Sequence, residues 1–186
     1  RHRNVANLVT MFDRSGSWEL PHAVQFQNLL SISCSMTCVT TEELQTIADS
    51  CLGATLRELQ LARCTGVGNP QSLHQIARLT SLITLDLHGC LGYGPYEWGN
   101  GSDRGGNTRE LLAISRSCAS LEVLDLSFNE EDISVMAEMV CNLPRLHTFI
   151  LVAAYGGVEY PNVLVNCVRQ MGKDVRHDFE IVWSRN

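Results

Sequence analysis

One short motif recurs along the chain at a nearly constant interval. Leucines in the order Leu-x-x-Leu-x-Leu begin at Leu56, at Leu82 and at Leu121, and a looser copy begins at Leu146. The first two copies lie 26 positions apart (56 to 82), and the last two lie 25 apart (121 to 146). A unit of this length cannot bury its own apolar side, so it must stack on its neighbours. The repeat therefore predicts a solenoid.

The interval between the second and third copies is longer than the others. Leu82 and Leu121 lie 39 positions apart, which is one period of 26 plus 13 residues. Insertions in solenoids fall on the connections and not in the stacked elements. The stretch from about 89 to 107 is rich in glycine and contains Pro95, and these residues disfavour helix and strand. We expect an inserted loop here.

In the first half of each unit, leucines alternate with polar residues. Leu59 and Leu61 flank Gln60, and the next copy repeats the alternation around Asp86. Such alternation is typical of a strand with one buried side. We expect these strands to stack in parallel on the concave side of a short right-handed arc.

In the second half of each unit, apolar residues have the spacing of one helical face. Thr40-x-x-Glu43 and Asn107-x-x-Glu110 are start signals for two of these helices, because such pairs can satisfy free backbone N–H groups. We expect helices on the convex side of the arc. The apolar sets are Leu44, Ile47, Ala48 and Cys51; Leu111, Ile114 and Cys118; Ile133, Met136, Ala137 and Val140; and Leu164, Cys167, Val168 and Met171.

The two ends of the chain differ from the central repeats, as terminal units of solenoids do. We expect one domain over residues 1–186, with an N-terminal cap at 1–26, repeats at 27–154 and a C-terminal cap at 155–186. The N-terminal cap is predicted from a helical stripe formed by Val5, Leu8, Val9 and Phe12.

The C-terminal segment predicts one more strand. Phe179, Ile181 and Trp183 alternate along it. Such a strand either caps the sheet or offers a docking edge to a partner.

The eight cysteines allow two interpretations, a disulfide framework or reduced thiols. Cys64 and Cys90 occupy the same site in successive repeats, and a buried free cysteine behaves as a small hydrophobe. We therefore expect reduced thiols and an intracellular, reducing compartment, the cytosol or nucleus, with the mitochondrion as an alternative. Cys34 and Cys38 lack the second ligand pair of a structural zinc site, so no metal is expected. No apolar run approaches the roughly 18 to 20 residues of a membrane span, so we expect no membrane insertion.

The unit from Leu56 to Cys64 has the order Leu-x-x-Leu-x-Leu-x-x-Cys. It resembles the leucine-rich repeat family, in particular the cysteine-containing subtype of F-box leucine-rich repeat proteins. The resemblance covers roughly residues 27 to 154, with departures at Asn129 and Ala154, which occupy the cysteine position in later copies. It implies an α/β solenoid and is specific for fold, not for function.

Motifs of catalysis are missing from the sequence. It contains no Gly-x-x-x-x-Gly-Lys-Ser/Thr loop, no Gly-x-Ser-x-Gly elbow and no His-Glu-x-x-His helix. We therefore expect that the chain is not an enzyme and that it has no catalytic residues, no cofactor and no small-molecule substrate. The net charge of −6 and the isoelectric point near 5.5 oppose a phosphate backbone, so nucleic acid is not expected as a direct ligand.

If the repeated leucines point inward, the alternating residues line the concave side. Asp86 and Asp125 would then be neighbours on adjacent strands, where like charges are mildly destabilising unless a basic partner offsets them. Aspartate is also frequent at this position in the family that the chain resembles, so a purely structural role stays open. The three rows are Glu58, Thr84, Val123 and Thr148; Gln60, Asp86, Asp125 and Ile150; and Ala62, His88, Ser127 and Val152.

The inserted loop is a second candidate surface, because exposed tyrosine and tryptophan are enriched in binding hot spots. These rings could equally pack back on the edge of the solenoid. The residues expected to bind a partner are Glu58, Gln60, Asp86, His88, Asp125, Tyr93, Tyr96 and Trp98.

Together these patterns predict a non-catalytic protein–protein interaction module. We expect a scaffold or accessory subunit of a large intracellular complex, bound to other protein subunits. The alternative is the substrate-recognition part of an F-box-type ubiquitin ligase.

Overall fold

The computed structural model of the protein describes residues 7–10, 28–91, 107–129, 132–152, 163, 164, 166 and 180–183. In these ranges the chain forms an α/β fold with one parallel sheet, whose strands lie side by side in sequence order. The strands are β1 (Asn7–Thr10), β2 (Ser31–Cys34), β3 (Glu58–Gln60), β4 (Thr84–Asp86), β5 (Val123–Asp125), β6 (Thr148–Leu151) and β7 (Glu180–Trp183).

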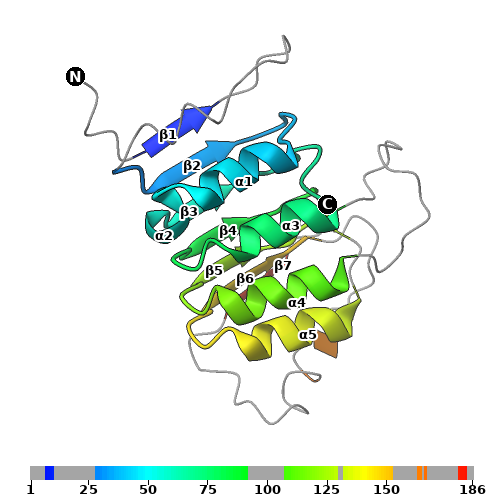
Figure 1. Ribbon diagram of the computed structural model, residues 1–186. Coiled ribbons are helices and arrows are strands. Elements are labelled where there is room, and N and C mark those ends of the chain that lie inside the picture. Colours follow the sequence, from blue (N-terminus) through cyan, green and yellow to red (C-terminus); the bar gives the residue numbers. More distant parts are fainter. Residues whose placement is uncertain are drawn as a thin grey trace.

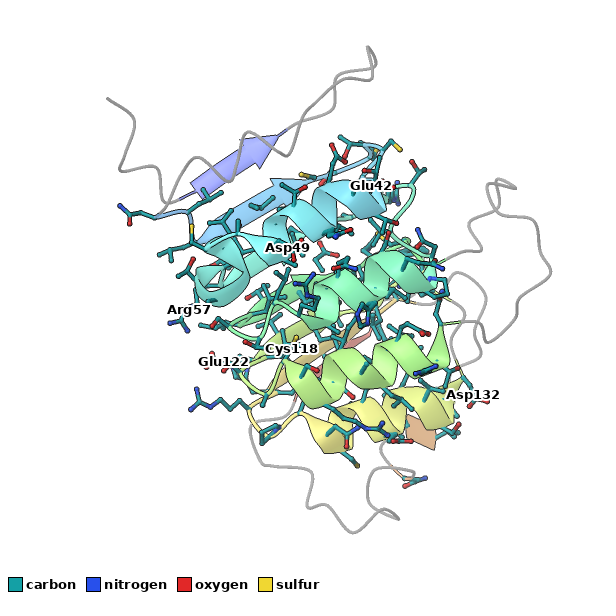
Figure 2. The ribbon with its side chains drawn as sticks, viewed as in Figure 1. Glu42, Asp49, Arg57, Cys118, Glu122 and Asp132 are labelled. Carbon is teal, nitrogen blue, oxygen red and sulfur yellow. The ribbon has the colours of Figure 1, made fainter. Side chains whose placement is uncertain are left out.

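Helices follow the strands in alternation and lie on one face of the sheet (Figure 1). Neighbouring helices pack on each other in the order α1, α3, α4, α5. Arg57 and Glu122 mark the edge where strands begin, and Asp132 marks the opposite edge, where α5 begins (Figure 2). The helices are α1 (Thr41–Asp49), α2 (Leu52–Thr55), α3 (Pro70–Ala77), α4 (Thr108–Ser117) and α5 (Ile133–Asn142).

Three columns of apolar side chains run across the strands and form the core. Leu59 pairs in register with Leu85, Leu85 with Leu124, and Leu124 with Phe149, and all four are fully buried. The predicted inward orientation of these residues and the parallel stacking are therefore confirmed. The flanking columns, also buried, are Leu29, Leu56, Leu82, Leu121 and Leu146, and Cys34, Leu61, Leu87, Leu126 and Leu151.

The predicted capping box at the start of α1 is confirmed. The Glu43 N–H donates to Thr40 Oγ1 at 3.2 Å, and the Thr40 N–H donates to Glu43 Oε2 at 2.8 Å. The equivalent prediction at Asn107 is wrong, although α4 begins where expected. Asn107 makes no side-chain cap, because its φ of −101° and ψ of −3° are not those of the extended conformation that a capping residue adopts. Its amide Nδ2 donates to the carbonyl of Gly68 at 3.0 Å.

The apolar helical faces are largely confirmed, with one exception. Leu44 and Ile47 of α1 are buried, but Cys51 is exposed because α1 ends at Asp49. Leu164 is buried, whereas the rest of its predicted set, Cys167, Val168 and Met171, lies outside the described residues.

The predicted N-terminal helix is wrong over Asn7–Thr10, which forms β1 and pairs in parallel with β2. Such a short apolar segment fits either period, and pairing with a sheet edge decides the outcome. The predicted C-terminal strand is confirmed as β7, which pairs with β6.

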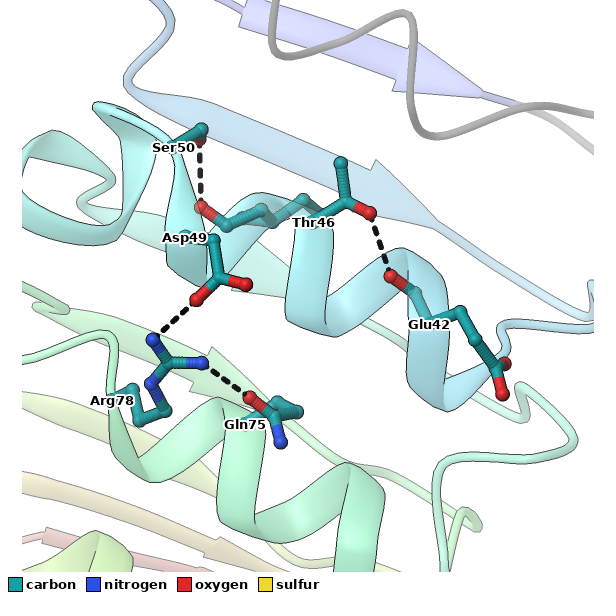
Figure 3. A network of polar contacts seen from close by, with 7 residues as sticks. Glu42, Thr46, Asp49, Ser50, Gln75 and Arg78 are labelled. Atoms are coloured by element: carbon teal, nitrogen blue, oxygen red, sulfur yellow. Dashed lines mark hydrogen bonds and ion pairs between the residues drawn. The ribbon is translucent and has the colours of Figure 1, made fainter.

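Polar contacts join neighbouring helices across their exposed surface. Arg78 donates to Asp49 Oδ1 at 2.5 Å and to Gln75 Oε1 at 2.7 Å, which links α1 to α3 (Figure 3). Arg116 of α4 bonds to Glu138 of α5 at 2.8 Å. Exposed ion pairs contribute only about 0.2–1 kcal/mol each, so the apolar columns carry most of the stability.

The cysteines of the described residues are all free, which fits a reducing compartment. Cys34 is buried and Cys38 is exposed. No helix within the described ranges is long and apolar enough to span a membrane.

Leu85 lies in the middle of the central column, so its truncation tests the shared core. We expect Leu85→Ala to lower the free energy of unfolding by about 2–5 kcal/mol, because it leaves a cavity between two strands. Urea denaturation measures this loss. Thr84→Ala on the same strand points to the other face and is the control, with an expected change below about 1 kcal/mol. Equal losses would contradict the assigned orientation of β4.

Candidate protein-interaction face

The sheet face opposite α1, α3, α4 and α5, called the far face here, carries the side chains that alternate with the buried columns. Strand register places its residues in the predicted rows. The first row joins Glu58, Thr84, Val123 and Thr148, and the second joins Gln60, Asp86, Asp125 and Ile150. Most of these residues are partly exposed, and Glu58 is exposed.

A left-handed residue ends each of four successive turns beside this face. Met36, Arg63 and Phe128 have φ values of 55°, 56° and 57°, and Gly89 has 61°. Each N–H donates to a carbonyl of the next unit, over 2.7 to 2.9 Å. These bonds extend the strand ladder into the turns. The acceptors are the carbonyls of Ala62, His88, Ser127 and Val152.

After three of these left-handed positions, the following residue ties its unit to the preceding one. Cys90 Sγ donates to the carbonyl of Leu61 at 2.7 Å, and Asn129 Nδ2 donates to that of Leu87 at 2.9 Å. Cys64 Sγ contacts the carbonyl of Cys34 at 3.6 Å in the same way. Burial raises the pKa of the Cys90 thiol to about 12, so this thiol stays protonated and keeps its hydrogen to donate.

Asp86 and Asp125 lie directly opposite each other on adjacent strands. Asp86 Oδ1 accepts the N–H of His88 at 2.8 Å, and Asp125 Oδ1 accepts the N–H of Ser127 at 2.8 Å. Burial and then the Asp125 carboxylate raise the pKa of Asp86 above its usual value, against the effect of the His88 hydrogen bond. Both carboxylates therefore stabilise their turns, and the ionised form of Asp86 is electrostatically unfavourable.

A small aromatic and basic group adjoins the acidic pair. The rings of His88 and Phe128 lie with centroids 4.8 Å apart and planes tilted by 49°. Arg63 Nε lies 3.4 Å from His88 Nε2. Neither aspartate has an ion-pair partner among the described side chains, so Arg63 does not neutralise them.

The far face changes character across the sheet. On β3 and β4 it presents Gln60, Asp86 and His88, whereas β5 and β6 add three partly exposed aliphatic side chains. These are Val123, Ile150 and Val152. The face is acidic and polar on one side and apolar on the other.

Five of the predicted binding residues come together on this face: Glu58, Gln60, Asp86, His88 and Asp125. Tyr93, Tyr96 and Trp98 of the predicted loop lie outside the described residues. Phe128 was not predicted as a site residue. Its position follows the strand register, but nothing in its residue type signals a left-handed turn.

The described residues hold no group of three or more His, Cys, Asp or Glu side chains that could bind a metal ion. No protein-family model matches the chain, and no curated protein matches it at a significant level.

The two aspartate environments predict opposite effects of charge removal. The pKa of Asp86 is raised, so its ionisation opposes folding, and Asp86→Asn keeps an acceptor for the His88 N–H. We expect this variant to be more stable at pH 7 by about 0.5 kcal/mol. The gain should vanish at pH 3, below the usual aspartate pKa, where the natural side chain is also neutral.

Asp132 supplies the matched control for this measurement. The N–H and hydroxyl of Ser134 lower the pKa of Asp132, so its ionised form favours folding. Asp132→Asn should lower stability at pH 7, and the loss should fade as the pH falls through the usual aspartate range. Urea midpoints at both pH values measure the two effects. Destabilisation by both variants at pH 7 would contradict the assignment for Asp86.

Proposed function

We propose that this chain is a leucine-rich repeat solenoid of the cysteine-containing type that acts as a non-catalytic protein–protein interaction module. One contrast carries the proposal. The columns facing the helices are almost uniformly leucine and buried, whereas the rows of the far face hold acidic, amide, hydroxyl and aliphatic side chains that are mostly accessible. A uniform interior with a varied, accessible opposite wall is the arrangement that repeat proteins use for recognition.

The stacked order of strands supports the solenoid part of this proposal. Each strand pairs only with strands of the adjoining units, and each turn bonds to the next unit through a left-handed residue. Cys64 and Cys90 occupy equivalent positions and contact the preceding unit in the same way. This is the position that gives the cysteine-containing subtype its name.

The contacts of the polar groups on the far face support a binding role. The carboxylates of Asp86 and Asp125 accept backbone N–H groups, and the His88 ring packs on Phe128. These contacts fix the side chains, as a recognition surface needs, and leave Oδ2 of each carboxylate to accept a donor from a partner.

The partners in this proposal are other protein subunits, within a large intracellular complex that the chain serves as scaffold or accessory subunit. The stretch at about 89–107, with Tyr93, Tyr96 and Trp98, is part of this proposal as a second contact surface, and packing of these rings on the solenoid is the alternative. The net charge of −6 disfavours nucleic acid. The free thiols favour a reducing compartment, the cytosol, nucleus or mitochondrion.

A second candidate is the substrate-recognition part of an F-box-type ubiquitin ligase. The shared position of Cys64 and Cys90 favours it, because the F-box proteins that the chain resembles carry this repeat subtype. The two candidate functions predict different co-purifying proteins. Stoichiometric structural subunits support the scaffold, and cullin adaptors support the ligase.

Bulky substitutions on the two faces test the interaction role. We expect Thr84→Trp combined with Val123→Trp to abolish capture of the natural partners, because two indoles would block the far face. Gln45→Trp combined with Gln71→Trp places the same bulk on exposed positions of α1 and α3 and should leave capture unchanged. Quantitative mass spectrometry of tagged protein isolated from cells measures both. Equal capture by the two variants, with both folded, would refute the far face as the binding surface.

A further inference from the structure

On the far face, an acidic pair lies next to an apolar surface. The aspartates of β4 and β5 stand side by side, and Ile150 follows Asp125 in the same row on β6. Val152 follows directly after β6, and its N–H donates to Ser127 Oγ at 3.0 Å. Adjacent strands lie about 4.8 Å apart, so the middle of the acidic pair lies about 7 Å from the aliphatic side chain of Ile150.

The two carboxylates leave a pair of acceptor atoms free. Each uses Oδ1 for its own turn, and the Oδ2 atoms accept no hydrogen bond from the described residues. Like charges directly opposite each other on a sheet are destabilising, and Arg63 bonds to His88 rather than to this pair. A guanidinium or ammonium group from outside would satisfy both oxygens and relieve the repulsion.

We infer that the far face binds a basic amphipathic segment of another protein, with an arginine or lysine on Asp86 and Asp125 and an aliphatic side chain on Ile150 and Val152. This inference rests on the proposed interaction function and names its partner class. Charge complementarity selects the cation, and the aliphatic side chains beside it select an apolar neighbour. A nucleic acid would bring phosphates against the acidic pair, and a metal ion would leave the aliphatic residues without a role.

The spacing also restricts the geometry of the ligand. Residues i and i+4 on a helix lie about 5–6 Å apart, and residues i and i+2 on a strand lie about 6.6 Å apart, both close to this separation. The partner therefore carries its cation and its aliphatic residue one helical turn apart, or on alternate positions of an extended segment. His88 and Phe128 border the acidic pair and contact the flat side of a bound guanidinium.

A designed peptide tests this inference directly. The probe is a fluorescein-labelled peptide of about 16 residues, long enough to form a helix, built on alanine with leucine and arginine at i and i+4. We expect it to bind the whole chain in a salt-dependent manner. A matched probe with glutamate in place of arginine should not bind.

Charge-neutral variants identify the site. Asp86→Asn combined with Asp125→Asn keeps both turn acceptors and should weaken peptide binding at least about tenfold. Asp49→Asn combined with Glu138→Gln removes the same charge from the helical face, where both residues form exposed ion pairs, and should leave binding unchanged. Asp86→Lys combined with Asp125→Lys should bind the glutamate probe.

Several outcomes would overturn the inference. These are no binding of the arginine probe, equal binding to the neutral far-face variant, or competition by single-stranded RNA. If the natural chain self-associates and the neutral far-face variant does not, a second copy of the chain is the occupant instead. The proposed function has a separate test, because the variants of Thr84 and Val123 block the face without altering charge. If those variants lose partner capture while the arginine probe fails, the interaction function stands and the partner class is wrong.

Discussion

The rest of the structure depends on one constraint, which is that a single β–α unit cannot bury its own leucines. Each strand contributes one residue to the central column, and that residue is covered by its equivalents on both neighbours, as Leu85 is by Leu59 and Leu124. Burying a leucine contributes roughly 1.5–3 kcal/mol, far more than any exposed ion pair between the helices. Stacking therefore dictates the strand order, and the strand order places equivalent side chains of the far face in straight rows.

Hydrogen bonds in the turns fix the register between adjacent strands. A left-handed residue such as Arg63 sends its N–H to the next unit, while the following residue, Cys64, reaches back to the preceding one. Burial keeps such thiols protonated and able to donate, as the raised pKa of Cys64 and Cys90 indicates. Asn129 makes the same backward bond with an amide, so cysteine and asparagine are interchangeable here for a physical reason. The rigid turns hold the acidic pair and the aliphatic side chains at constant separations.

The sequence alone predicts the features that the repeated motif determines. It fails at positions where a particular contact overrides the pattern. The columns, the rows of the far face and the Thr40 capping box follow from spacing, and the structure confirms them. The segment around Asn7–Thr10 was predicted as helix because four residues cannot distinguish the two periods, and its pairing with β2 decides for strand. The spacing of Asn107 and Glu110 predicts a cap, but Asn107 does not adopt the extended conformation of a capping residue. Its amide donates to the Gly68 carbonyl, 39 positions away in the chain, which spacing cannot reveal. Among Met36, Arg63, Gly89 and Phe128, Gly89 alone has a residue type that signals its left-handed conformation.

Among the neighbouring strands of the described sheet, β4 and β5 are separated by the longest stretch of chain. Thr84 and Val123 are direct partners on adjacent strands although 39 positions separate them in the chain. Their Cα atoms should lie about 5 Å apart, within disulfide range. Under mild oxidation, Thr84→Cys combined with Val123→Cys should form an intramolecular disulfide that peptide mass spectrometry identifies, whereas Thr84→Cys combined with Thr148→Cys, two strands apart, should not. Failure of the first pair to form, or equal formation of both, would contradict the continuous stacked sheet.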